Sequence, residues 1–442
     1  MIFSSYQFII FFLIFIFLIK NFQSYQRQII LIFSIFFYSY WNPVFIFLII
    51  FYCIMGYILI KKEIKLSYSI ILIICPLIYF KYSYFFFNLF YTNKTNPFIY
   101  TGELPLAISF ITFTILAVII DIKKKIFLDK LNLQSFSEFI LYFPQLIAGP
   151  ILRAKELIPK LNKKISFNLG NIKFGLILFL IGFVKKIFLA DNIGIFIDPY
   201  FESPNLYTSK DLIKAFFLFP IQIYFDFSGY VDMALGISAT LGIYLPINFN
   251  KPYLSYSLTE FWRNWHITLS NWFRDYLYIP LGGSRVGSMR RNLNLVLTMS
   301  LAGLWHGASF NFILWGFLNG IILSFEKKIL ILNKKNLFRL VLNCFIVFNL
   351  WVIFRIEKLI FIKYFYLNLY KNIGEIFNIF NLLIFLSIIF FVWVQKYENH
   401  KYISSISRKL SLNIIIPIFF VFLLTGFGIS LGQSEKFIYF NF

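Results

Sequence analysis

The first candidate for chemistry is His306, which lies in the segment LAGLWHGAS at residues 301–309. Gly303 and Gly307 flank it and would let backbone or substrate approach closely. An ionisable side chain in an apolar segment is a functional candidate by default. Burial disfavours the charged imidazolium, so a buried imidazole stays neutral, the form that a general base requires. The alternative is a structural histidine that hydrogen-bonds across helices.

A second imidazole, His266, ends the heptapeptide EFWRNWH. On a helix, Trp262 and His266 are neighbours four residues apart, and so are Glu260 and Asn264. One interpretation is that His266 belongs to a functional site. Tryptophan and arginine are also typical of an amphipathic helix at the membrane interface, where the histidine would be incidental.

Two carboxylates, Asp226 and Asp232, stand within the apolar segment FDFSGYVDMA. Carboxylates at membrane depth are costly unless they are paired. They could orient an active-site group, or they could pair with Arg263, Arg274 or a lysine. The third histidine of the chain, His400, lies in a polar stretch that we interpret as a surface loop.

Motifs of several other enzyme classes are missing from the sequence. It contains no GxxxxGK[ST] phosphate loop, no GxGxxG dinucleotide fingerprint, no GxSxG elbow and no HExxH. The spacing of the three cysteines matches no metal site, so we expect no bound metal. A histidine-dependent transfer reaction remains the leading enzyme class.

The elements that must hold these residues are membrane helices. Of the 442 residues, 60% are hydrophobic and only 14% are charged, which excludes a water-soluble domain and a disordered chain. The net charge of +22 comes from short lysine and arginine clusters between apolar stretches. Such clusters indicate cytoplasmic loops and contact with anionic lipids rather than nucleic acid.

Stretches long enough to cross a membrane recur along the chain. Uncharged stretches of this kind run over residues 2–19, 28–60, 104–120, 308–325, 376–394 and 411–434. With shorter segments included, window length predicts roughly ten to twelve membrane segments. A break at residues 41–43 divides the second stretch. Between about residues 143 and 320 the apolar segments are short and carry Pro, Gly and charges, as at residues 225–229. Irregular backbone persists in a membrane only where protein buries it or it lines a cavity, so we expect the site there.

Several motifs in this order resemble the membrane-bound O-acyltransferase (MBOAT) family, and most of all the membrane subunit of bacterial alginate and peptidoglycan O-acetylation systems. The motifs are YFPQLIAGPILR at residues 142–153, FDFSGYVDMA at 225–234, EFWRNWH at 260–266, FRDYLYIPLGGSR at 273–285 and LWHG at 304–307. The resemblance covers nearly the whole chain and includes the aromatic ending at residues 437–442. It implies one all-α membrane domain over residues 1–442, with a ring of helices around short, tilted or re-entrant ones that form a tunnel.

The resemblance also implies roles for the residues above. His306 would be catalytic, as general base or transient acyl carrier, and His266 would be a second catalytic-site residue. Trp305 and Gly307 of the same motif would line the tunnel. Trp262, Arg263, Asn264 and Asp226 would contact or orient the substrate.

The implied reaction is the transfer of acetyl from a cytoplasmic thioester, acetyl-CoA, toward an extracytoplasmic polysaccharide or peptidoglycan. No tightly bound cofactor is expected. The implied location is the bacterial inner membrane, with a periplasmic or surface protein that completes the transfer. Two alternatives stay open: an O-acyltransferase for D-alanyl or longer acyl groups with a lipid or protein acceptor, and a polytopic transporter, in which the aspartates would matter more than the histidines.

Overall fold

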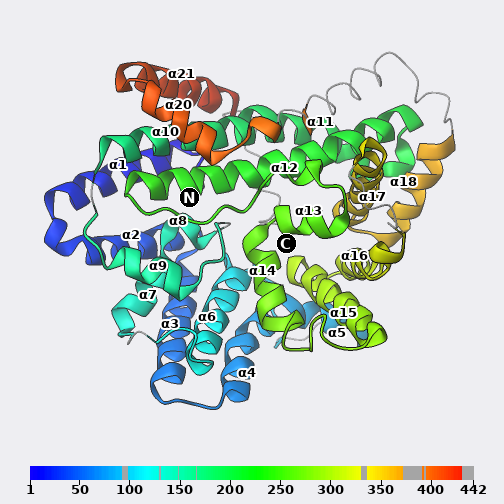
Figure 1. The fold of residues 1–442 in the computed structure, drawn as a ribbon, viewed down its shortest axis with the longest axis horizontal. Coiled ribbons are helices and arrows are strands. Elements are labelled where there is room, and N and C mark those ends of the chain that lie inside the picture. The colour runs from blue at the N-terminus through cyan, green and yellow to red at the C-terminus, as the bar shows by residue number, and fades with distance from the viewer. Residues whose placement is uncertain are drawn as a thin grey trace. The chain divides into compact units, whose positions relative to one another are not determined.

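A computed structural model describes residues 1–91, 98–128, 131–147, 149–165, 167–329, 336–371, 391–392 and 395–430. These residues form α-helices, short 3-10 or π segments and connecting turns, with no strand among them, as predicted (Figure 1). They group into two compact units. Unit 1 comprises residues 1–180, 230–246 and 410–421, and unit 2 comprises 181–229, 247–409 and 422–442. That residues 1–442 form one domain stays a prediction.

The first helices of the chain belong to unit 1. They are α1 (Tyr6–Asn21), α2 (Gln26–Ser39), α3 (Ile46–Lys61), α4 (Leu66–Leu77), α5 (Ser83–Phe90), α6 (Ile108–Lys123), α7 (Leu133–Leu141), α8 (Phe143–Leu146) and α9 (Ala154–Leu161). Helix α10 (Leu169–Phe183) begins there as well. The predicted break at residues 41–43 is confirmed, since Asn42 Oδ1 accepts a hydrogen bond from Val44 N at 3.1 Å between α2 and α3.

A cluster of phenylalanines forms the centre of unit 1. The ring of Phe143 lies 5.1 Å from that of Phe15, 5.4 Å from that of Phe11 and 5.6 Å from that of Phe37. All four side chains are buried. Aromatic rings at these separations contribute beyond their buried area, so Phe143 of α8 helps to hold α1 and α2 together.

The remaining helices belong to unit 2 or extend into it. They are α11 (Asp191–Glu202), α12 (Ser209–Thr240), α13 (Leu258–Asn264), α14 (Ile267–Phe273), α15 (Ser288–His306), α16 (Phe310–Ile329), α17 (Leu337–Arg355), α18 (Leu359–Lys371), α20 (His400–Lys409) and α21 (Leu412–Ser430). Two π-helical segments, η4 (Val184–Ala190) and η7 (Arg274–Tyr278), follow α10 and α14. His400, predicted to lie in a loop, is instead the first residue of α20.

Among the described residues, five helices are long and apolar enough to cross a membrane. They are Pro43–Lys61, Leu66–Phe90, Ser209–Thr240, Leu337–Arg355 and Leu412–Ile429. The bent pair Tyr6–Asn21 and Gln23–Ser39 makes a sixth if it counts as one span. Most of the other predicted segments fold as helices that are shorter or more polar, and the segment at 376–394 lies almost wholly outside the described residues, as does the aromatic ending at 437–442.

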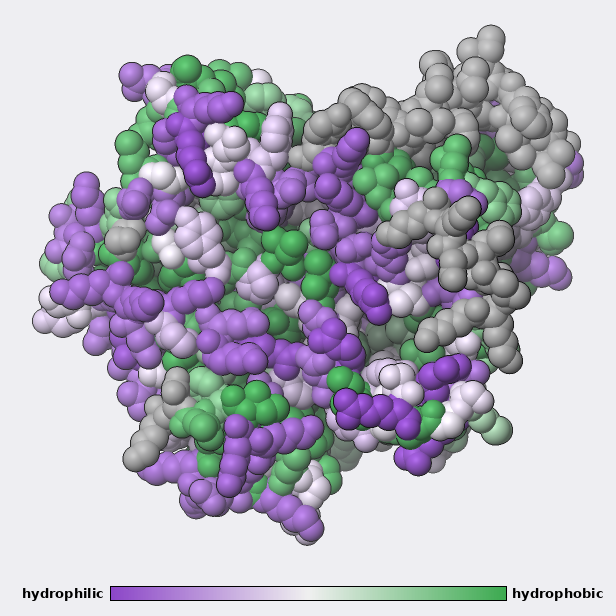
Figure 2. Space-filling model, in the orientation of Figure 1, coloured by the Kyte–Doolittle hydropathy of each residue, from purple (hydrophilic) through white to green (hydrophobic). Residues whose placement is uncertain are grey.

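The surfaces of these spans are apolar. Leu424, Val421 and Phe420 of α21 and Phe47 of α3 are exposed. Figure 2 shows hydrophobic side chains over α21 and hydrophilic ones gathered over α9. Large exposed apolar surfaces are what contact with lipid requires, because the bilayer core offers no partner to polar groups. The chain is therefore a multi-pass membrane protein.

One expectation about the centre of the chain is wrong. Residues 225–229 were expected to interrupt the helical backbone, but they lie within the continuous helix α12. The glycine there serves close packing: a Cβ at Gly229 would lie 2.7 Å from the carbonyl oxygen of Gly182 on α10. Close helix contact through small residues is common in membranes, so Gly229 marks a helix crossing and not a break.

Candidate functional site

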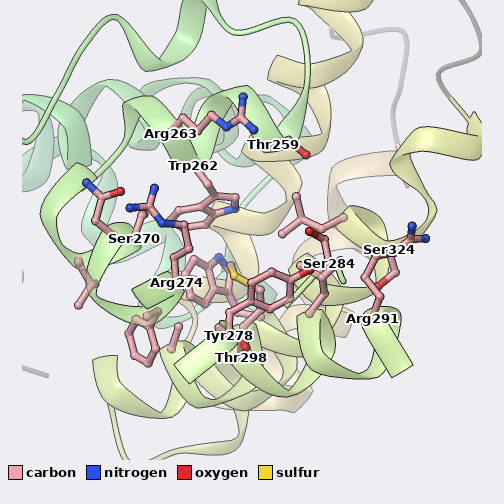
Figure 3. A pocket seen from close by; sticks show the side chains of 18 of the residues that line it. Thr259, Trp262, Arg263, Ser270, Arg274, Tyr278, Ser284, Arg291, Thr298 and Ser324 are labelled. Atoms are coloured by element: carbon pink, nitrogen blue, oxygen red, sulfur yellow. The ribbon is translucent and has the colours of Figure 1, made fainter. Parts of the chain in front are cut away.

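A cavity of about 460 Å³ lies within unit 2 (Figure 3). It is bounded by helices α13 to α16 and the segments between them. The lining residues are Thr259, Trp262, Arg263, Leu269, Ser270, Asn271, Phe273, Arg274, Tyr278, Ser284, Arg291, Leu295, Thr298, Met299, Ala302, His306, Trp315, Leu323 and Ser324. In Figure 3 the side chains of Trp262 and Tyr278 point into this space.

Helix α15 provides one long wall of the cavity. Its lining residues run from Arg291 near its start to His306 at its end. Thr298, Ala302 and His306 are spaced four residues apart and so share one face. At the usual rise per residue, Arg291 and His306 are about 22 Å apart along the helix axis. The lining of the cavity therefore spans most of α15, with Arg291 near the start of the helix and His306 at its end.

Helix α16 lies against α15 at backbone distance. A Cβ at Gly303 would lie 2.1 Å from Phe312 O, and one at Gly316 would lie 2.2 Å from Met299 O. At Gly320 the nearest atom, Val296 Cα, would be 2.5 Å away. Any larger residue would push the helices apart, as in other small-xxx-small contacts of membrane helices. This antiparallel contact fixes Trp315 beside the His306 end of the cavity.

Aromatic rings surround the imidazole of His306, which is only 4% exposed. The ring centroids of Trp305, Trp315 and Phe354 lie 5.0, 5.3 and 5.2 Å from it. Gly307 allows a close approach, as the sequence predicts. The group that approaches is Phe312, whose ring would lie 2.3 Å from a Cβ at Gly307. His306 thus reaches the cavity from an apolar wall.

Helix α13 supplies Thr259, Trp262 and Arg263 to the cavity. Ser257 is the N-cap of this helix, and its Oγ accepts a hydrogen bond from Glu260 N at 3.1 Å. Such an N-cap satisfies one of the amide groups left over at a helix start. Asn264, the third residue of this motif predicted to contact the substrate, is absent from the lining, and its Nδ2 donates to Ser255 Oγ at 3.1 Å.

His266 does not share a helix with Trp262, which corrects the expectation that the two are neighbours four residues apart. Helix α13 ends at Asn264, and His266 takes the left-handed conformation (φ 43°) at the cap of α14. Its imidazole is buried and does not line the cavity. The ring lies 4.7 Å from that of Phe227 and 6.2 Å from that of Trp305. Burial lowers the pKa of His266 to about 3, so it is neutral at physiological pH.

Asp226 is part of a buried ion-pair cluster outside the cavity lining. Lys186 Nζ lies 2.6 Å from Asp226 Oδ1 and 2.6 Å from Asp191 Oδ1. Of the partners expected from the sequence, a lysine is therefore the one found. Breaking a buried pair leaves an uncompensated charge, so this cluster binds η4 and α11 to α12. The other carboxylate, Asp232, belongs to unit 1.

Three arginines line the cavity, and two of them were not predicted to do so. Arg263 comes from α13, Arg274 from η7 and Arg291 from α15. The sequence predicts Arg274 only as a partner for an aspartate, and it predicts no role for Arg291 or Trp315. The sequence does contain a pattern that predicts close packing of α16. This pattern is Gly316-x-x-x-Gly320, a spacing typical of closely packed membrane helices.

Comparisons with known proteins agree on one family. The family model described as MBOAT, membrane-bound O-acyltransferase family, matches residues 122–366. A probable alginate O-acetylase of Pseudomonas syringae pv. tomato is 40% identical over 356 residues, which cover 76% of this chain and 68% of that protein. A peptidoglycan O-acetyltransferase of Helicobacter pylori is 36% identical over 374 residues, 74% of this chain and 70% of that protein. A teichoic acid D-alanyltransferase of Streptococcus thermophilus is 30% identical over 233 residues, 49% of this chain and 55% of that protein.

Proposed function

This chain belongs to the membrane-bound O-acyltransferase family, and we propose that it transfers acetyl from acetyl-CoA toward hydroxyl groups of an extracytoplasmic polysaccharide or peptidoglycan. The observation that carries the proposal is the cavity that joins three arginines to His306. The relatives named as O-acetyltransferases match larger shares of the chain, at higher identity, than the one named as a D-alanyltransferase. This difference favours acetyl over D-alanyl.

The arginines suit a donor that carries phosphate groups. A guanidinium stays charged at any physiological pH and offers paired N–H donors that match phosphate oxygens. Coenzyme A bears its phosphates at one end and its thioester at the end of a long, flexible arm. Arg291 lies about 22 Å along α15 from His306, and this separation favours binding of such a molecule lengthwise, with its phosphates toward Arg291. In this arrangement the thioester carbon reaches the imidazole.

His306 then acts as the general base. It accepts the proton of the acceptor hydroxyl, and the oxygen attacks the thioester carbonyl carbon. The new C–O ester bond forms, the C–S bond breaks, and the departing thiolate takes the proton from the imidazolium. A positioned base of this kind accelerates a reaction by about 10²–10⁴-fold. His266 contributes as a neutral second site residue that packs against Trp305 of the same motif.

A transient acyl-imidazole on His306 is the competing mechanism. It would form when the imidazole itself attacks the thioester, and it would then pass acetyl to the hydroxyl. Rapid quenching of the protein with labelled acetyl-CoA distinguishes the two, because only the acyl carrier leaves label on His306. The base mechanism predicts no labelled protein.

The names of the relatives support a proposal for the acceptor and the location. Their names specify alginate and peptidoglycan, which lie outside the cytoplasm, whereas acetyl-CoA is made inside. We therefore propose that the protein lies in the bacterial inner membrane and delivers acetyl to a periplasmic or surface protein that completes the transfer. A transporter is less well supported, because Asp226 is paired with Lys186 and lies outside the cavity lining.

The experiment that tests the proposal uses the full chain reconstituted in liposomes. Labelled acetyl-CoA is supplied to wild type and to His306→Ala. Free CoA is measured with a small alcohol as the accepting hydroxyl, and labelled ester is measured separately with a glycan fragment. Wild type releases CoA, and His306→Ala falls at least about 100-fold. Equal CoA release by both proteins would contradict the role of His306. Full transfer to glycan by the chain alone would contradict the need for a partner.

A further inference from the structure

The start of α13 is fixed by a carboxylate from another helix. Glu326 of α16 accepts hydrogen bonds from three donors: Leu258 N, Thr259 N and Thr259 Oγ1. The bond from Thr259 N to Oε2 measures 3.1 Å. Glu326 is 8% exposed, so these bonds are largely screened from water. The first amide groups of a helix have no partner within it, and a negative charge beside them is favourable.

A second bond joins the same two helices at the cavity. Trp262 Nε1 donates to Asn319 Oδ1 at 3.0 Å, and Asn319 is held in turn by its own bond to Trp315 O at 2.8 Å. Asn319 and Glu326 are seven residues apart, so they lie on the same face of α16. Helix α13 is short, at seven residues, and helices of that length are not stable alone. Its position therefore depends on α16.

The position of α13 affects the cavity because residues of this helix line it. Trp262 and Arg263 both line the cavity, and Arg263 is one of its three cations. Resting on the proposed function, we propose that Glu326 is a positioning residue for the donor. Its carboxylate holds the start of α13, and this keeps Arg263 where the phosphates of CoA bind. Glu326 itself does not line the cavity.

Substitution of Glu326 by glutamine or aspartate tests this proposal, because the three side chains differ in their acceptor atoms or length. A carboxylate has two acceptor oxygens, whereas the amide of glutamine has one acceptor and one donor group. Three donors converge on Glu326. In Glu326→Gln a single amide oxygen replaces the two acceptor oxygens. If Nε2 faces Thr259, it donates to Thr259 Oγ1, and Thr259 N keeps only the longer bond to Oε1 at 3.4 Å. In the other orientation Nε2 faces the donor Leu258 N, so the contact is weakened either way. Glu326→Asp keeps both acceptor oxygens on a shorter stem, so it rescues part of the contact.

The experiment measures binding and turnover with the purified full chain. Binding uses desulfo-CoA, which carries the phosphates and no thioester. Turnover compares acetyl-CoA with the acetyl thioester of N-acetylcysteamine, which lacks phosphates. We expect Glu326→Gln to bind desulfo-CoA about tenfold or more weakly, with Glu326→Asp in between. Turnover of the short thioester stays within about twofold of wild type, because that donor does not use Arg263.

The matched control is Glu156→Gln in unit 1. Glu156 also accepts a helix-start hydrogen bond, from Arg153 N, and is exposed on α9. The Glu156→Gln variant should bind desulfo-CoA with the affinity of wild type. Unchanged binding by Glu326→Gln would overturn the proposal, and so would an equal loss on both thioesters, which indicates a general structural role. If wild type neither binds desulfo-CoA nor turns over acetyl-CoA, the donor assignment fails first and this role fails with it.

Discussion

The indole of Trp315 lies edge-on to the imidazole of His306, with ring centroids 5.3 Å apart and an interplanar angle of 89°. Trp315 is itself backed by Phe354 at 5.2 Å and by Trp351 at 6.0 Å. Its side chain is 1% exposed and lines the cavity. A ring held in this way forms a fixed wall next to the proposed base. The space beside His306 therefore suits a small acyl group.

Replacing Trp315 by a smaller residue should allow the site to accept longer acyl groups. We expect Trp315→Leu to raise butyryl transfer relative to acetyl transfer on the order of tenfold, since each methylene excluded from a site is worth about 10–200-fold. Leucine is chosen because truncation of a buried tryptophan to alanine costs about 3–5 kcal/mol. Competition between acetyl-CoA and butyryl-CoA measures the ratio. An unchanged ratio in a stably folded variant would refute the role of Trp315.

Loss of a cavity arginine should weaken donor binding more than chemistry. Arg291 lies at the far end of α15 from His306, so Arg291→Gln should raise the KM for acetyl-CoA about tenfold and leave kcat within about threefold. The neighbouring Arg290 is exposed and does not line the cavity, which makes Arg290→Gln the matched control. Equal KM values for the two variants would show that Arg291 does not bind the donor.

The ion-pair cluster around Lys186 should support folding and not donor binding. Lys186→Met leaves Asp226 and Asp191 buried without their cation, and loss of one partner of a buried pair costs about 3–5 kcal/mol. We expect a lower Tm in detergent and an unchanged KM for acetyl-CoA in the protein that stays folded. A raised KM with an unchanged Tm would instead place the cluster in the reaction.

The buried His266 predicts how stability depends on pH. Its pKa is lowered from 6.5 to about 3 by burial, so protonation favours the unfolded chain. The contribution of the neutral imidazole to the free energy of unfolding is complete above pH 6.5. It is lost as the pH falls toward 3, by up to about 1.4 kcal/mol per pH unit. The Tm should therefore fall less steeply between pH 7.5 and pH 4.5 in His266→Phe than in wild type. Parallel curves for the two proteins would contradict this, and His400→Ala serves as the control.

Local patterns in the sequence predicted much of the fold. The helical class follows from apolar stretches of membrane length, and the break at residues 41–43 follows from Asn42 and Pro43, because each interrupts a helix through its own backbone or side chain. His306 could be singled out because an ionisable group in an apolar segment is costly and therefore rare.

What the sequence could not predict depends on contacts between distant residues. Helix periodicity alone put Trp262 and His266 on one helix, but packing places His266 against Phe227 and separates the two side chains. The arginines of the cavity come from three elements, and no local pattern says that Arg263 and Arg291 face the same space. Asp226 could be expected to have a cationic partner, but Lys186 could be chosen only once η4 and α12 were packed together.

The central claim is that an acetyl transfer to a cell-surface glycan depends on His306. The measurement is ester-linked acetate on isolated glycans from a deletion strain that carries wild type, His306→Ala or the control His400→Ala, with protein levels in the membrane matched. Wild type and His400→Ala should restore the acetate, and His306→Ala should leave it below about 1% of wild type. Full restoration by His306→Ala would contradict the account.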